Sequence, residues 1–234
     1  MIRILLLACL LALSACQPAE IDPAFDETKG AELLASYEAA RADGDWEIAE
    51  ARGNELRQRH GETAAAKTMR ETLDEVRAEA EKMREQRRLV GLWEYQSIPA
   101  GGGTQHTAAI YSRVETDPYA EEGTPVAIPD ARLILRRHPD WGDSAYLVLT
   151  QQALQCGSPC VLEIRFDDGE PQDYTGDPAD TGTGPALFIE ERDRFLAAMR
   201  EARQVRIKLP RSGHLVPVFE FEVGGFRPTP ELID

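Results

Sequence analysis

The sequence predicts an α+β fold, with a helical N-terminal part followed by an antiparallel β-rich domain that carries one further helix. Residues 27–88 are rich in Ala, Glu and Arg and contain no Pro, which is typical of helices. Residues 91–234 hold most of the Gly and Pro, and their short runs of alternating apolar and polar residues indicate strands. The change of character near Leu89 therefore divides the chain into a helical segment, residues 27–89, and a β-rich domain, residues 90–228.

A helical hairpin is expected at the start of the helical segment. The first helix, 28–42, is apolar on one side and stops before Gly44, and Asp45 occupies the N-cap position of a second helix, 46–59. The hairpin carries the pattern Tyr37, Ala40, Gly44, Asp45, Trp46, Ala49 and Leu56, which resembles a single tetratricopeptide-like unit. Gly61 stands where that repeat has Pro, and no second copy follows. Because such repeats need about three stacked units to be stable, we expect a lone hairpin that packs on another element.

A third helix is expected over residues 62–88, and its apolar residues recur at steps of three and four. This heptad seam consists of Ala66, Met69, Leu73, Val76, Ala80, Met83 and Val90. At 1.5 Å per residue the helix would be about 40 Å long. Two interpretations stay open. The seam covers the hairpin and completes a three-helix unit, or it forms a coiled coil with a second copy of the chain or with another protein.

The β-rich domain contains seven runs of alternating residues that predict strands. They are residues 92–98, 107–115, 132–136, 145–149, 161–167, 205–209 and 218–223. Each run has one apolar and one polar face, which indicates an antiparallel sheet with one solvated face, arranged as a β-sandwich or an open barrel. A single helix over residues 190–203 carries Phe195, Leu196 and Met199 toward the sheet. Residues 229–234 are expected to form a tail.

Residues 1–15 have the features of a secretory signal. Arg3 gives a charged start, a short apolar core follows, and the segment ends in the small residues Ser14 and Ala15. The apolar core is shorter than the ~18 residues that a transmembrane helix needs, so the segment predicts export rather than a membrane span. One interpretation is a plain signal peptide cut near Ala15, which would leave Cys16 as a free thiol or as a disulfide partner.

The sequence LSAC at residues 13–16 resembles the lipobox of bacterial lipoproteins. The resemblance implies cleavage before Cys16 and lipidation of this residue with several acyl chains, palmitate among them. Each buried methylene is worth about 0.8 kcal/mol, so such an anchor would be stable. Gln17, in place of Asp, implies sorting to the outer membrane, with the protein on its periplasmic face. Residues 16–26 would then form a lipidated tether.

The cysteines of the exported chain predict one disulfide. Cys9 would leave with the signal and Cys16 would take the lipid, which leaves Cys156 and Cys160. A pair of cysteines outside the cytoplasm is expected to be oxidised. A redox dithiol of the thioredoxin kind has two residues between its cysteines, whereas this pair encloses three. With no His nearby, the pair also supplies too few ligands for a metal site.

The charge balance bears on the class of partner. The chain has 26 basic and 41 acidic residues and a net charge of −15, which becomes −16 when Arg3 leaves with the signal. It has no cluster of Lys and Arg that would neutralise phosphates, so no nucleic-acid partner is expected. The acidity is interpreted as a source of solubility, in preference to a docking surface for a basic partner.

No catalytic residue, metal site or cofactor is predicted. The four histidines, His60, His106, His138 and His214, have no metal-binding spacing, and no Gly-x-Ser-x-Gly, phosphate-loop or Rossmann motif is present. The stretch 167–184 is rich in Asp and Gly, which suits either turns or a calcium site, but it lacks the ligand spacing of an EF-hand. Turn chemistry is the preferred explanation, with calcium as the alternative.

The β-rich domain also contains a characteristic order of short motifs. They are Leu133-x-Leu135-Arg136, Cys156, Ile164-Arg165-Phe166-Asp167, Leu187-Phe188-Ile189, Phe195, Val205-Arg206-Ile207 and Phe219-x-Phe221-x-Val223-x-Gly225-Phe226. Over residues 130–226 this order resembles small periplasmic β-domains of uncharacterised proteobacterial lipoproteins and of an accessory lipoprotein of type VI secretion. The close pair Cys156 and Cys160 departs from that pattern. The resemblance implies a non-enzymatic envelope domain with no catalytic residues.

We therefore expect a membrane-anchored envelope lipoprotein that acts as a non-enzymatic binding or structural module. Its expected partners are the membrane, through the lipid at Cys16, an envelope protein, and a second copy of the chain through the helix at residues 62–88. The alternative is an envelope hydrolase acting on cell-wall or lipid substrates, with polar residues assembled from distant strands. A deep pocket that collects His, Asp and Ser would favour the hydrolase, and a flat apolar patch would favour binding.

Overall fold

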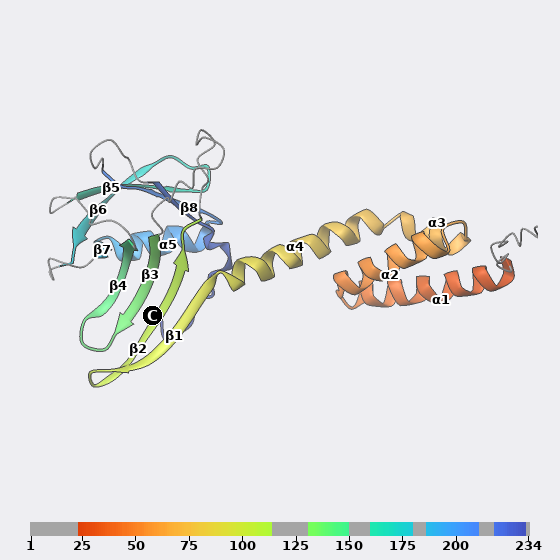
Figure 1. Cartoon of the computed structure of the whole chain (residues 1–234), viewed down its shortest axis with the longest axis horizontal. Helices are drawn as coiled ribbons and strands as arrows, with labels where there is room; N and C mark the ends of the chain where they lie inside the picture. The colour runs from red at the N-terminus through yellow and green to blue at the C-terminus, as the bar shows by residue number, and fades with distance from the viewer. Residues whose placement is uncertain (1–22, 114–130, 150–159, 180–185, 211–217, 233–234) are drawn as a thin grey trace, which may run out of the picture. The chain divides into compact units, whose positions relative to one another are not determined.

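The computed structural model describes residues 23–113, 131–149, 160–179, 186–210 and 218–232. These residues form an α+β fold that consists of an N-terminal helical unit and an antiparallel sheet curled into an open half-barrel (Figure 1). The chain divides into two compact units between residues 81 and 82. None of the described helices combines the length and apolarity that a membrane span needs.

The helical unit consists of α1 (Pro23–Ala42), α2 (Trp46–Arg59), α3 (Ala64–Arg70) and the first turns of α4 (Leu73–Gly91). The predicted hairpin is confirmed as α1 and α2, and Gly44 adopts a φ of 77° in the turn between them. Helix α1 begins at Pro23, a residue suited to the first helical position. Residues 23–26, which were expected in the tether, therefore belong to this helix.

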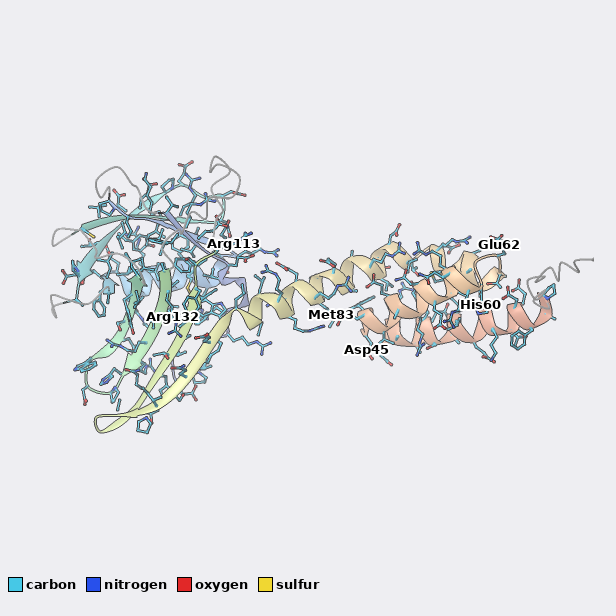
Figure 2. The ribbon with its side chains drawn as sticks, viewed as in Figure 1. Asp45, His60, Glu62, Met83, Arg113 and Arg132 are labelled. Atoms are coloured by element: carbon cyan, nitrogen blue, oxygen red, sulfur yellow. The ribbon has the colours of Figure 1, made fainter. Side chains whose placement is uncertain are left out.

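The core of the helical unit absorbs most of the predicted heptad seam. Its buried residues are Tyr37, Ala40, Ala49, Leu56, Ala65, Ala66, Met69, Leu73 and Val76. Gly53 allows a close approach here, because a Cβ at this position would lie 2.7 Å from Leu73 Cδ1 and 3.2 Å from Tyr37 Cε2. Ala80 is also buried, whereas Met83, labelled in Figure 2, is 42% exposed. The seam from Ala66 to Val76 is thus an internal contact of the helical unit, which agrees with the three-helix interpretation.

The single helix predicted over residues 62–88 is wrong, because the chain breaks at Glu71 and Thr72 into α3 and α4. The Thr72 amide donates to Met69 O at 3.2 Å, and the Thr72 carbonyl accepts from Val76 N at 3.1 Å. The Thr72 hydroxyl lies 2.8 Å from the Tyr37 hydroxyl on α1. This tertiary hydrogen bond and the 3-10-type hydrogen bond from Thr72 to Met69 explain the break, which the heptad periodicity does not predict.

The β-rich unit contains nine described strands, which all pair antiparallel in the order β1-β2-β3-β4-β7-β6-β5-β8-β9. They are β1 (Trp93–Ala100), β2 (Gly103–Tyr111), β3 (Ala131–His138), β4 (Gly142–Leu149), β5 (Cys160–Phe166), β6 (Gln172–Pro178), β7 (Ala186–Ile189), β8 (Val205–Lys208) and β9 (Val218–Phe221), followed by the 3-10 turn η1 (Val223–Gly225). A single curled sheet of this kind is an open barrel, so of the two predicted arrangements the open barrel is the correct one.

One end of the half-barrel is drawn together by backbone and side-chain contacts. The Arg113 amide, just after β2, donates to Glu220 O on β9 at 2.7 Å, and the Arg113 side chain lies 3.3 Å from the Glu220 carboxylate. Figure 2 labels Arg113. The last turns of α4 belong to this unit as well. Arg88 Nη2 lies 2.6 Å from Glu222 Oε1, and Leu89 packs against Gly225, where no Cβ would fit.

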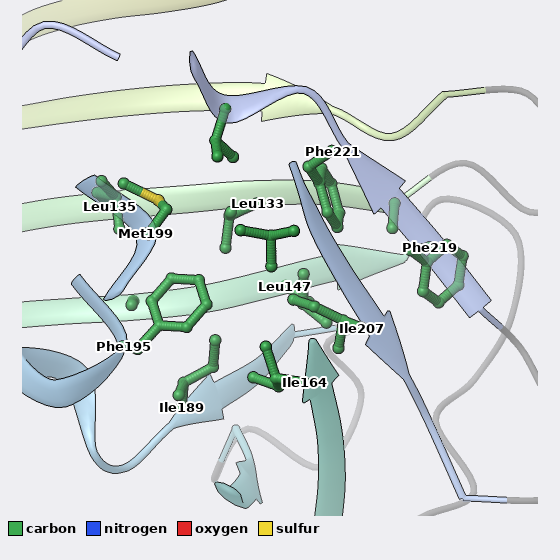
Figure 3. Packing of buried hydrophobic residues seen from close by; sticks show 14 of the residues in the cluster. Leu133, Leu135, Leu147, Ile164, Ile189, Phe195, Met199, Ile207, Phe219 and Phe221 are labelled. Carbon is green, nitrogen blue, oxygen red and sulfur yellow. The ribbon is translucent and has the colours of Figure 1, made fainter. Parts of the chain in front are cut away.

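Helix α5 (Arg192–Glu201) fills the concave side of the sheet. Figure 3 shows Phe195 and Met199 of this helix among apolar side chains of the strands, such as Leu147 and Ile207. Phe195 and Leu196 are nearly inaccessible. The expectation that this helix packs onto the sheet through its apolar side is confirmed, and it leaves the convex side of the sheet as the solvated face.

Strand β6 lies in the stretch 167–184, which was expected to be a loop. Tyr174 is 1% exposed, and Gly176 lies so close to Leu162 and Cys160 that a Cβ there would be 3.1 Å from both side chains. The strand was missed because its alternation rests on one large apolar residue, Tyr174, among Asp, Thr and Gly. Residues 180–184 of the stretch lie outside the described part of the chain.

The C-terminal residues 229–232, expected as a tail, pack against the β-rich unit. Leu232 is 4% exposed and belongs to the core. Arg192 Nη2 donates to Leu232 O at 3.1 Å, and Arg137 Nη1 donates to Pro230 O at 3.3 Å. The tail is ordered because two arginines satisfy its carbonyl groups while one leucine contributes apolar burial.

Candidate functional site: an arginine–aromatic face on the sheet

Strand β3 separates two kinds of side chain. Leu133 and Leu135 point into the core and are at most 4% exposed, whereas Arg132, Ile134 and Arg136 alternate with them and therefore point to the convex face. Figure 2 labels Arg132 in this part of the sheet. The convex face thus has a cation, an aliphatic residue and a second cation in one row along the strand.

Neighbouring strands add aromatic side chains to this row. Tyr111 on β2 pairs with Arg132, Tyr146 on β4 pairs with Ile134, and Phe188 on β7 pairs with Tyr146. The Tyr146 and Phe188 ring centroids are 5.1 Å apart. We call this surface the arginine–aromatic face, and it comprises Tyr111, Arg132, Ile134, Arg136, Trp141, Tyr146 and Phe188.

Arg136 is held between two aromatic rings. Its guanidinium carbon lies 5.3 Å from the Trp141 ring centroid and 5.2 Å from that of Tyr146. Its Nε donates to Ser144 Oγ at 3.2 Å. Among the residues that the structure describes, no carboxylate pairs with Arg136. The cation is therefore oriented by π systems and a hydroxyl group, while its charge is not neutralised by an ion pair.

Trp141 reaches the face from the turn between β3 and β4. Its ring stacks on the His138 imidazole, with centroids 3.9 Å apart and planes 13° apart. His138 Nδ1 accepts the Asp140 amide hydrogen at 3.1 Å, so in the neutral ring the proton is on Nε2. The Asp140 hydrogen bond thus orients His138, and the stacked His138 ring orients the Trp141 indole. The indole is nevertheless 69% exposed.

Arg132 occupies the other end of the row. Its guanidinium carbon lies 5.2 Å from the Tyr111 ring centroid, and it forms an ion pair with Glu94 on β1. Arg132 Nε is buried and, within the described residues, has no hydrogen-bond acceptor. Arg132 is thus more fully paired than Arg136.

The electrostatics of Tyr146 place both arginines next to the centre of the face. Burial raises the pKa of the Tyr146 hydroxyl, and the charges of Arg136 and Arg132 oppose this rise. Both guanidinium groups therefore act on the same phenol. The face thus has two cations beside Tyr146, although the chain has a net charge of −15.

The face has the composition of a binding surface. Trp141 and Tyr111 are 69% and 50% exposed, which is high for large aromatic residues. Trp, Tyr and Arg are the residue types most enriched at the energetic centres of protein interfaces. The face also has no helix over it in the described residues, since α5 lies on the concave side. It can therefore bind a partner through apolar contact and guanidinium pairing.

A second candidate is a charged cavity of about 470 Å³ lined by Asp143, Glu190, Glu191, Arg192, Asp193 and Arg194. Its charged groups are largely engaged with one another or with the backbone. Asp143 accepts two hydrogen bonds from Arg137, at 2.9 and 3.1 Å, and lies 3.2 Å from Arg192. These contacts, the Arg137 hydrogen bond first, hold the pKa of Asp143 below its usual value. Glu191 accepts the Thr175 amide hydrogen at 2.8 Å. These charged groups therefore hold the N-terminal end of α5 against the sheet and against the C-terminal residues.

The predicted lipidation and disulfide sites are only partly described. Cys16 and Cys156 lie outside the described residues, and Cys160 is buried at the start of β5. Lipidation of Cys16 and a bridge between Cys156 and Cys160 stay predictions.

The histidines and carboxylates named from the sequence are dispersed. His60 contacts Asp26 in the helical unit, His106 contacts Ser97, and His138 supports Trp141, while His214 lies outside the described part of the chain. Asp167 Oδ1 accepts the amide hydrogens of Arg203 and Gln204, both at 2.9 Å, so this carboxylate stabilises a turn. In the described ranges no three His, Cys, Asp or Glu residues lie close enough to hold a metal ion.

Sequence reasoning missed the arginine–aromatic face as a site. The alternation of Arg with Leu in β3 predicts a strand and does not by itself predict a binding site. The signal that would have found the face is the spacing of Arg132 and Arg136 on one side of that strand, with Trp141 in the turn that follows. The contributions of Tyr111, Tyr146 and Phe188 depend on the strand order, which the sequence did not reveal.

Comparisons with known proteins add no assignment. No family model matches the chain, and no match to it was found among curated proteins or among solved structures.

Proposed function

We propose that this chain is a membrane-anchored envelope lipoprotein that acts as a non-enzymatic binding module, with the arginine–aromatic face as its binding surface. The lipobox-like sequence before Cys16 supports the lipid anchor, and Gln17 supports a location on the periplasmic face of the outer membrane. A disulfide between Cys156 and Cys160 is part of this proposal, because it suits an oxidising compartment.

The observation that carries the binding function is the environment of Arg136. A guanidinium between Trp141 and Tyr146, without a carboxylate among its described contacts, is oriented in advance and free to pair with an incoming group. Preorientation of this kind lowers the entropic cost of binding. The exposed rings of Trp141 and Tyr111 supply apolar contact area with few rotatable bonds.

An envelope protein is the proposed partner class. A second copy of the chain bound through residues 62–88, which form α3 and α4, is less well supported, because Leu73 and Val76 are 3% and 0% exposed within the helical unit. The seam has no large apolar side chain left for a partner until Met83. Contact with another protein through the β-rich unit needs no rearrangement of either core.

The charged cavity gives little support to the hydrolase alternative. A carboxylate that acts as a general acid or base needs a pKa near the working pH, whereas the Arg137 and Arg192 contacts lower that of Asp143. The residues that line the cavity in the described part of the chain include no Ser, Cys or His. Their pairing suits a structural role.

Site-specific photo-crosslinking in cells tests the proposal. A benzophenone amino acid replaces Tyr111, which lies on the face, and in a matched control it replaces Val161 on β5, which is 60% exposed. We expect a discrete adduct from position 111 and not from position 161. The same adducts from both positions, or none from position 111, would contradict the assignment of the face.

A further inference from the structure

We propose that the face binds an acidic polypeptide segment in which an apolar side chain lies between two carboxylates. This inference rests on the proposed binding function and names the partner of the same surface. One carboxylate pairs with Arg136 and the other with Arg132, while the apolar side chain contacts Ile134, Tyr146 and Phe188.

The spacing of the two cations sets the spacing of the carboxylates. Arg132 and Arg136 are four residues apart on one strand, and a strand rises about 3.3 Å per residue, so their backbones are about 13 Å apart. An extended segment matches this distance with acidic residues at positions i and i+4. Both side chains of that segment would then point to the same face, with residue i+2 between them.

The chemistry of guanidinium groups favours carboxylates. Arginine offers a planar set of donors that pairs with a carboxylate through two parallel hydrogen bonds. Arg136 uses Nε for Ser144 Oγ at 3.2 Å, and no described acceptor occupies its terminal nitrogens. Arg132 already pairs with Glu94 on the edge strand β1, so an incoming carboxylate must compete with or join this pair. Arg136 is therefore the stronger anchor.

The centre of the face suits an apolar side chain. Ile134 pairs with Tyr146, Tyr146 pairs with Phe188, and the two rings are 5.1 Å apart. On its other side Ile134 pairs with Ala109, a buried residue too small to cover the Ile134 side chain by itself. Apolar contact between two cations reproduces the pattern of a protein interface, with an apolar centre and a polar rim.

Other classes of partner fit the face less well. A nucleic acid or an anionic bilayer needs many cations, and this chain carries two on the face with a net charge of −15 overall. A sugar needs the flat side of a ring, but His138 already stacks on Trp141, and Arg136 lies over Trp141 and Tyr146. A polypeptide meets both requirements, since it supplies carboxylates and an apolar side chain together.

The experiment uses the full-length chain in cells, with the photo-crosslinker at position 111 and identification of the crosslinked component by mass spectrometry. The variant Arg132→Glu/Arg136→Glu reverses both charges of the face. The matched control, Arg165→Glu/Arg200→Glu, makes the same change in net charge elsewhere in the β-rich unit. Circular dichroism of the purified variants checks that each is folded.

We expect a polypeptide adduct within an acidic segment, reduced at least about tenfold by reversal of the face charges and unchanged by the control reversal. Replacement of the two acidic residues of the partner by Arg should restore the adduct with the reversed face. Such rescue distinguishes direct pairing from a loss of folding.

The other outcomes overturn the inference in different ways. A glycan or lipid adduct, or a polypeptide adduct that is insensitive to charge reversal, would refute the acidic segment and leave the face as a binding surface. Failure of the charge-reversed partner to restore the adduct would likewise refute direct pairing. The absence of any adduct from position 111 would refute both the inference and the proposed function.

Discussion

The hydroxyl oxygens of Tyr37 and Thr72 lie 2.8 Å apart and join α1 to the break between α3 and α4. Tyr37 is 1% exposed, so its hydroxyl group depends on this partner. The contact explains why the helix breaks at Thr72 although the apolar periodicity of residues 62–88 continues through this position.

Tyr37→Phe should therefore destabilise the helical unit by about 1 kcal/mol, the usual net contribution of an intramolecular hydrogen bond. Urea unfolding followed by circular dichroism measures the change. Tyr111→Phe serves as the control. Tyr111 is 50% exposed, so removal of its hydroxyl group should leave the free energy of unfolding nearly unchanged. Equal effects of the two substitutions would argue against the Tyr37–Thr72 bond.

Leu73→Ala should destabilise the helical unit by about 2 to 4 kcal/mol, since it removes most of a buried side chain that packs closely against Gly53. Thermal unfolding of the variant beside Met83→Ala, at a position that is 42% exposed, measures the difference. Sedimentation of both variants reports the oligomeric state. Dissociation of an oligomer by Leu73→Ala, with no loss of monomer stability, would favour the coiled-coil interpretation instead.

Asp143 should make the free energy of unfolding depend on pH in the acidic range. Arg137 and then Arg192 hold the pKa of this carboxyl below its usual value of 3.8 in the folded state. Its contribution is therefore complete above pH of about 4 and is lost as the pH falls through the lowered pKa of the folded protein. The free energy of unfolding of the wild type should approach that of Asp143→Asn over this acidic range. Near neutral pH the variant should be less stable by about 1.5 kcal/mol, and parallel pH profiles would refute the contribution.

Cys16→Ser should abolish acyl labelling and release the protein from membranes. Labelling with an alkyne-tagged palmitate, followed by membrane fractionation, tests this expectation. Cys9→Ser, within the predicted signal, is the control and should leave labelling intact. Label that persists in Cys16→Ser would exclude this residue as the lipidation site.

Reduction of the predicted bridge between Cys156 and Cys160 should loosen one short segment without unfolding the β-rich unit. A bridge that encloses three residues stabilises by at most about 2 to 3 kcal/mol. Alkylation of protein purified under oxidising conditions, read by mass spectrometry, measures the free thiols. Two alkylated cysteines in the unreduced protein would show that the bridge does not form.

Local patterns were enough to predict most of the elements. The hairpin of α1 and α2 follows from its apolar spacing and from Gly44, and β3 follows from the alternation of Leu133 and Leu135 with Arg. These signals are local, because each residue's preference for one face depends on its own hydrophobicity and on the period of its element. The division into a helical part and an antiparallel β-rich part, and the place of α5 against the sheet, could therefore be predicted from the sequence.

Tertiary structure alone decided the helix break at Thr72, the strand at Tyr174 and the packing of Leu232, since each depends on a partner far along the chain. The same holds for the arginine–aromatic face. The sequence determined that Arg132 and Arg136 share one side of a strand, but only the pairing of β4 with β7 brings Phe188 beside Tyr146. Strand order follows from the packing of the whole core around α5. The alternation of residues within one strand does not indicate which strand pairs with it.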